Sequence, residues 1–193
     1  MAAGLTGKFC PSIIYNNSLH YQQVDYYKVV WCKLSLPKHR FLLWQVVNAN
    51  LLTLDNLHRF NVHIDSSLCP VCGELDESHA HLFFECSLSK QVLAQVFDWL
   101  DCNTWPIEFD RWRVWLASRK NGFIFQLAIM ILAASVYSIW RNRNNCIFEL
   151  FSKSAVSIAS EVKAVFHHRL ISINKQELSA QEQRIVSQFL MSA

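Results

Sequence analysis

The sequence predicts a mainly α fold: a small helical module that contains one non-helical island, followed by a helical tail. The chain has four glycines and four prolines in 193 residues. A β-sandwich or barrel needs a turn about every 8–12 residues, so this chain has too few turn formers for one. Apolar residues recur at helical spacing along most of the chain, whereas residues 61–86 are polar and acidic.

The composition is that of a folded intracellular protein. Hydrophobic residues make up 52% and charged residues 17% of the chain, which excludes intrinsic disorder. Seven cysteines, an odd number, fit a disulfide framework poorly and favour a reducing compartment. Residues 1–8 contain no apolar signal segment. We therefore expect a nuclear or cytoplasmic protein that is not secreted.

The helical segments are expected as follows. Residues 1–22 lack periodicity and are predicted to be an irregular leader, and Thr53 is the expected N-cap of one short helix that stops at Asn61. The tail after Gly122 has neither glycine nor proline. The predicted helices cover 24–36, 38–49, 54–60, a segment from 87 or 89 to about 100, a short helix with Trp112 and Trp115, then 122–148, 154–171 and 179–189. The predicted domains are 1–22, 23–101 and 102–193.

One segment resembles a membrane span. The 19 residues from Gly122 to Trp140 carry no charge, and Arg141 and Arg143 follow them. However, the segment is barely long enough and contains Gln126, Ser135, Tyr137 and Ser138. We favour a buried core helix and do not expect a membrane partner.

The island at 61–86 has the spacing of a metal site. Cys69 and Cys72 are separated by two residues, and His81 and Cys86 follow. Three thiolates and one imidazole suit tetrahedral zinc, and four protein ligands leave no open position, so the predicted Zn²⁺ is single and structural. Scattered buried cysteines or a redox CxxC are alternatives, but no βαβ pattern accompanies the CxxC. His79 is the other candidate histidine; we expect it to be solvated or to support the ligands.

A second feature concerns RNA or DNA. The net charge of +3 hides an uneven distribution, with +4 over residues 1–64, −8 over 65–110 and +7 over 111–193. Residues 111–148 contain cations interleaved with tryptophans and no acid, a pattern typical of nucleic-acid contact. The alternative, which we favour, is a solvated face with tryptophans in the core. The candidate contacts are Arg111, Arg113, Arg119, Lys120, Arg141 and Arg143.

No catalytic machinery can be identified. The chain has no nucleophile in a recognisable turn and no glycine-rich phosphate loop. Its close acidic pairs follow no readable strand, whereas a polymerase or nuclease needs clustered carboxylates. We do not expect an enzyme.

Several motifs together resemble a known family. The motifs occur in this order: Val30-Trp31, Pro37-Lys-His-Arg-Phe41-Leu-Leu-Trp44, Leu51-Leu52-Thr53, Leu68-Cys69-Pro-Val-Cys72-Gly73 and His81-Leu82-Phe83-Phe84-x-Cys86. Residues 24–100 thereby resemble the zinc-binding domain of plant LINE-type (non-LTR) retrotransposon reverse transcriptases. Ile139-Trp140-x-x-Arg143-Asn144 is similar to the helical tail that follows it.

The resemblance implies the ligand set Cys69, Cys72, His81 and Cys86. It also implies a place beside a polymerase, where the module helps to hold RNA or DNA. This chain lacks the polymerase and nuclease motifs, so it resembles a stand-alone fragment that could act with a reverse transcriptase in trans. The alternative is a protein-interaction module or a decayed remnant without nucleic-acid binding.

Overall fold

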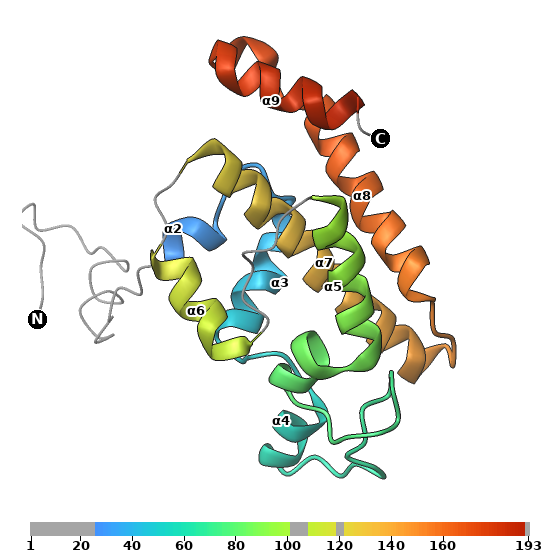
Figure 1. The fold of residues 1–193 in the computed structure, drawn as a ribbon. Helices are drawn as coiled ribbons and strands as arrows, with labels where there is room; N and C mark the ends of the chain where they lie inside the picture. Colours follow the sequence, from blue (N-terminus) through green and yellow to red (C-terminus); the bar gives the residue numbers. More distant parts are fainter. Residues whose placement is uncertain (1–25, 101–107, 119–121, 192–193) are drawn as a thin grey trace, which may run out of the picture.

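The computed structural model describes residues 26–100, 108–118 and 122–191, and within them the fold is mainly helical with no strand (Figure 1). The predicted fold class is therefore confirmed. The predicted leader at 1–22 lies outside the described residues. The helices are α2 (Tyr27–Val30), α3 (Pro37–Val47), α4 (Leu54–Arg59), the π-helix η1 (His81–Glu85), α5 (Ser87–Trp99), α6 (Phe109–Ser118), α7 (Phe123–Phe148), α8 (Ala155–Ile171), the 3-10 helix η2 (Lys175–Glu177) and α9 (Ala180–Met191).

Helix α7 is the central element of the fold. It packs against α3 on one side and α8 on another, and it also contacts α2 and α5. Residues on several sides of the helix are buried, including Ile129, Leu132, Val136 and Ile139. A helix with apolar residues on every side must be covered by other elements on every side, and α2, α3, α5 and α8 cover α7. The domain division predicted at residue 101 remains a prediction, but the described helices on its two sides share a core.

Helix α7 also meets the length and composition of a membrane span. It is apolar enough over 18 residues to cross a bilayer, yet 61% of that window is buried inside the protein. The helix thus has the burial of a core helix, which is the interpretation that we favoured from its sequence.

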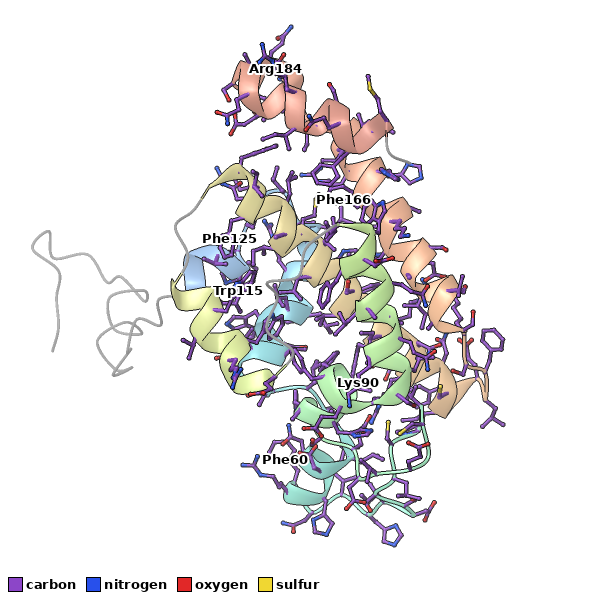
Figure 2. All side chains as sticks on the ribbon, viewed as in Figure 1. Phe60, Lys90, Trp115, Phe125, Phe166 and Arg184 are labelled. Atoms are coloured by element: carbon purple, nitrogen blue, oxygen red, sulfur yellow. The ribbon has the colours of Figure 1, made fainter. Side chains whose placement is uncertain are left out.

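A second group of apolar side chains joins α5, α7, α8 and α9. The ring of Phe166 on α8 lies 5.4 Å from that of Trp99 and 5.3 Å from that of Phe189, in edge-to-face arrangements. Figure 2 marks Phe166 where α8 runs beside α5. Val186, completely buried, attaches α9 to the same group.

The predicted helix over 24–36 is wrong in extent. The structure has only α2, and a turn follows in which the Ser35 N–H donates to the Cys32 carbonyl at 3.2 Å. Pro37 acts only on its neighbours: it holds the preceding Leu36 in an extended conformation (ψ 142°) and begins α3 at its first turn. Asn61 has a φ of 56°, as expected for a residue that stops a helix.

His39 should make the stability depend on pH. Its side chain is 3% exposed and its ring lies 4.4 Å from that of Tyr137, between α3 and α7. Burial, together with the Lys38 charge, lowers its pKa to about 4. The unfolded chain binds this proton near pH 6.5, so the stabilisation is complete above that pH and is lost as the pH falls towards 4.

We expect the protein to lose about 3 kcal/mol of unfolding free energy through this group between pH 6.5 and 4. In His39→Leu that contribution is absent, so urea unfolding should show a shallower pH dependence than in the wild type. Equal slopes in the two proteins would contradict the assignment.

Candidate metal centre

The first two cysteines lie on a tight turn. The Gly73 N–H donates to the Cys69 carbonyl at 2.8 Å, and Gly73 has a φ of 69°, which glycine adopts without strain. An antiparallel bridge between Leu68 and Asp76 closes the turn, and the Cys69 N–H donates to the Leu75 carbonyl at 2.8 Å. This geometry directs the side chains of Cys69 and Cys72 towards one place.

The other two candidate ligands come from the π-helix η1 and the residue after it. The Cys86 N–H donates to the His81 carbonyl at 2.7 Å, a five-residue step that brings the two residues together. The Ser78 hydroxyl accepts from the His81 N–H at 3.0 Å and fixes the start of this turn. Between the two residues, Leu82, Phe83 and Phe84 are buried in the core. The π-helix lies within the segment that was predicted to be non-helical.

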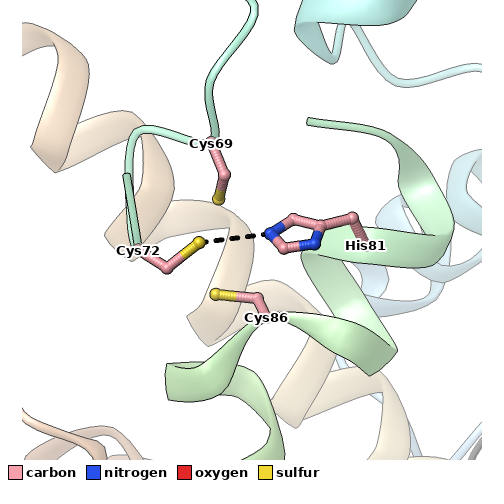
Figure 3. Close-up of side chains that lie close together, drawn as sticks. All are labelled: Cys69, Cys72, His81 and Cys86. Carbon is pink, nitrogen blue, oxygen red and sulfur yellow. Dashed lines mark hydrogen bonds between the residues drawn. The ribbon is translucent and has the colours of Figure 1, made fainter. Parts of the chain in front are cut away.

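The four donor atoms converge (Figure 3). The sulfurs of Cys69, Cys72 and Cys86 and a ring nitrogen of His81 lie within 4.8 Å of one another. Cys72 Sγ lies 3.3 Å from His81 Nε2. A tetrahedral zinc with Zn–S bonds of about 2.3 Å separates its sulfurs by about 3.8 Å, so the donors fit one ion of that size. Three of the four residues are buried, which is typical of a closed structural site.

The electrostatics favour a thiolate at the start of α5. The Cys86 pKa is lowered to about 5 because its sulfur accepts a hydrogen bond from the Cys69 thiol and further ones from the Ser89 and Leu88 N–H groups. The same Cys69–Cys86 hydrogen bond, with burial, raises the pKa of Cys69. A metal ion that binds here must displace the Cys69 proton, so its affinity rises with pH.

His79 is not a member of this cluster, and the expectation that it is solvated is wrong. It is 5% exposed. Its Nε2 accepts from the Leu51 N–H at 3.1 Å, and its Nδ1 lies 3.2 Å from the Thr53 hydroxyl. Burial lowers its pKa, which keeps the ring neutral. His79 therefore holds the segment that leads into α4.

Thr53 occupies the predicted N-cap position of α4, but its side chain does not cap the helix. The Leu54 N–H instead donates to Glu77 Oε2 at 2.7 Å. A carboxylate at a helix N-terminus satisfies a free N–H and complements the helix dipole.

Glu77 also forms a buried ion pair with Arg143. Arg143 Nε donates to Glu77 Oε1 at 2.7 Å and Nη2 to Oε2 at 2.6 Å. The side chain of Glu77 is 0% exposed and that of Arg143 is 4% exposed. The Arg143 guanidinium also lies 4.8 Å from the Trp140 ring centroid. The pair joins the loop next to the metal cluster to α7.

This pair corrects one predicted nucleic-acid contact. Arg143 is buried and its guanidinium is committed to Glu77, so it cannot reach a phosphate from solution. Arg141 is exposed on α7, and Arg111 is exposed on α6, where it pairs with Glu108 at 3.0 Å. Arg119, Lys120 and the side chain of Arg113 lie outside the described part of the chain. Trp112 is completely buried against Phe84, so for this tryptophan the alternative of a place in the core is correct.

Comparison with known families supports a zinc site. Residues 11–92 match the family described as zinc-binding in reverse transcriptase. The matched segment is less than half of the chain, contains all four clustered residues and ends before α7. Neither the curated proteins nor the solved structures gave a match. The match and the Cys3His cluster together indicate a zinc-binding module.

Removal of the Arg143 charge should strongly destabilise the protein. Arg143→Met leaves the Glu77 carboxylate buried without its partner, and we expect a loss of about 3–5 kcal/mol. The double variant Glu77→Gln, Arg143→Met should be less destabilised than the sum of the two single variants.

Urea unfolding of the zinc-loaded proteins measures both effects. Arg141→Met, an exposed arginine one half-turn away, is the matched control and should change the stability by less than about 0.5 kcal/mol. A similar small loss for Arg143→Met would show that the pair contributes little.

Proposed function

We propose that this chain is a non-catalytic zinc-binding module derived from a LINE-type retrotransposon reverse transcriptase. One structural Zn²⁺ would be held by Cys69, Cys72, His81 and Cys86. The observation that carries the proposal is the convergence of these four donors within 4.8 Å. The family match over residues 11–92 supports the choice of zinc.

The bound ion would supply a cross-link in a part of the chain that has little apolar core. In residues 61–76 Cys69 alone is fully buried, and only Val71 and Cys72 pack partly against the core, so burial of apolar side chains contributes little to holding this loop. Its fixed points are the backbone hydrogen bonds of the turn and the cluster itself. In small zinc modules the binding free energy is folding free energy, which compensates for a small core.

For the module as a whole, we propose an accessory role in RNA or DNA binding inside the cell, in the nucleus or the cytoplasm, with a reverse transcriptase acting in trans. The support is the exposed Arg141 and the acid-free sequence of α7. A protein-interaction role is the second candidate. It is favoured by Leu68 and Leu75, which are 45% and 58% exposed beside the acidic residues of the loop at 61–76, which we call the zinc loop.

The zinc proposal predicts one Zn²⁺ per chain in the purified protein. A chelator should lower the helicity and the melting temperature, because the loop and η1 lose their cross-link. Cys86→Ser and His81→Ala should abolish stoichiometric zinc binding, whereas His81→Cys should retain it, since a site of four cysteines also binds zinc.

Two controls separate this effect from general damage. Cys146→Ser changes a free cysteine of α7 that is outside the cluster and should leave the zinc content at the wild-type value. His79→Gln should lower stability but not zinc stoichiometry. A wild-type protein that contains no zinc and keeps its helicity in chelator would refute the proposal.

A further inference from the structure

A surface on α3 and its neighbours combines exposed aromatic rings with cations. The inner side of α3 is buried through Leu42, Leu43 and Val46, so its other side faces out. Phe41 on that side is 49% exposed. We call this surface the α3 face; its residues are Trp31, Lys38, Arg40, Phe41, Trp44 and Arg141.

Three aromatic rings follow one another across the α3 face. The ring of Phe41 lies 5.9 Å from that of Trp44, and the ring of Trp44 lies 6.5 Å from that of Trp31. Phe41 is exposed and Trp31 and Trp44 are half-buried, although Trp44 also packs against the edge of the core. A continuous row of rings at the surface can stack with flat ligands.

Cations lie at both ends of this row. The Arg40 guanidinium lies 5.7 Å from the Trp31 ring centroid. The exposed Lys38 lies 4.8 Å from the centroid of Tyr137, and Arg141 is one turn beyond Tyr137 on the same side of α7. Residues 26–54 and 122–148 contain no aspartate or glutamate, so no carboxylate of these segments neutralises these charges.

We propose that the α3 face binds single-stranded nucleic acid by stacking bases on Trp31, Trp44 and Phe41 and by contacting phosphates with Lys38, Arg40 and Arg141. The inference rests on the nucleic-acid part of the proposed function and assigns it mainly to residues outside the 111–143 region. Single strands are favoured over duplexes because their bases are free to stack. An acidic peptide would satisfy the cations but not the row of rings.

The test uses the zinc-loaded chain of 193 residues and fluorescence anisotropy of a labelled oligo(dT) strand. Phe41→Ala should weaken binding by about 5- to 150-fold, the range for loss of one base–aromatic stack, and Phe41→Trp should restore it. Arg141→Ala should reduce the slope of log affinity against log salt by about 0.7, the value for one phosphate contact to a single strand.

The control substitutions remove the same types of side chain as the test substitutions, but far from the α3 face. Figure 2 shows Phe60 at the α4 end of the molecule and Arg184 on α9 at the opposite end. Phe60 is 66% exposed, so Phe60→Ala removes an exposed phenyl ring, and Arg184→Ala removes an exposed guanidinium. Both should bind oligo(dT) as the wild type does. Each variant must also keep the wild-type helicity and melting temperature.

Each outcome has one meaning. If the wild type binds and Phe41→Ala and Arg141→Ala behave like their controls, the α3 face is refuted while nucleic-acid binding elsewhere stands. If the wild type does not bind, the nucleic-acid part of the proposed function fails, and the zinc content of the same sample shows whether the zinc module stands. If polyglutamate displaces oligo(dT) and binds in a Phe41-dependent way, the ligand is an acidic peptide and the inference is overturned.

Discussion

The carboxylate of Glu77 connects three parts of the protein that are distant in sequence. It accepts two hydrogen bonds from Arg143 on α7 and one from the first N–H of α4, and the Glu77 N–H donates to the Ser67 carbonyl, which closes the cysteine turn. A buried carboxylate is costly unless charge and hydrogen bonds compensate it, and here they do. Loss of any one of these contacts therefore leaves part of the free-energy cost of burying the carboxylate uncompensated. Glu77 thus adds a polar connection between the metal cluster and α7 to the apolar packing of Leu82, Phe83 and Phe84 in the shared core.

The loop that carries Cys69 and Cys72 shows why polar contacts have this role. Few apolar side chains lie around this loop, and the side chains of Leu68 and Leu75 are exposed to solvent. The hydrophobic effect, which orders α7 and α8, has little apolar surface to act on in this loop. Order then comes from specific bonds: the turn at Gly73, the ion pair at Glu77 and, in the zinc-bound form that we propose, the four ligands. The helical core and the zinc loop are thus stabilised by different kinds of interaction.

The features that the sequence predicted well are those with a local signal. Long apolar periodicity predicted α7 and α8 within about a residue at each end, and the CxxC with a later histidine and cysteine predicted which donors converge. The features that it missed depend on distant partners. Nothing near Arg143 shows that its charge is buried, because its partner is 66 residues away in sequence. The π-helix at His81–Glu85 is similarly hidden, since five residues with helical propensity look the same whether the turn closes over four residues or five.

The distribution of charge places the proposed metal and nucleic-acid functions on separate surfaces. Glu74, Asp76 and Glu85 are exposed around the metal cluster, and a zinc with three thiolates and a neutral histidine adds a further negative charge. This end of the protein repels phosphate over about one Debye length, roughly 10 Å. The acid-free α3 face, by contrast, attracts it. In the nucleic-acid binding that we propose, this field would steer the strand away from the metal cluster. The proposed zinc would then act through the fold that it stabilises and not by direct contact with the strand.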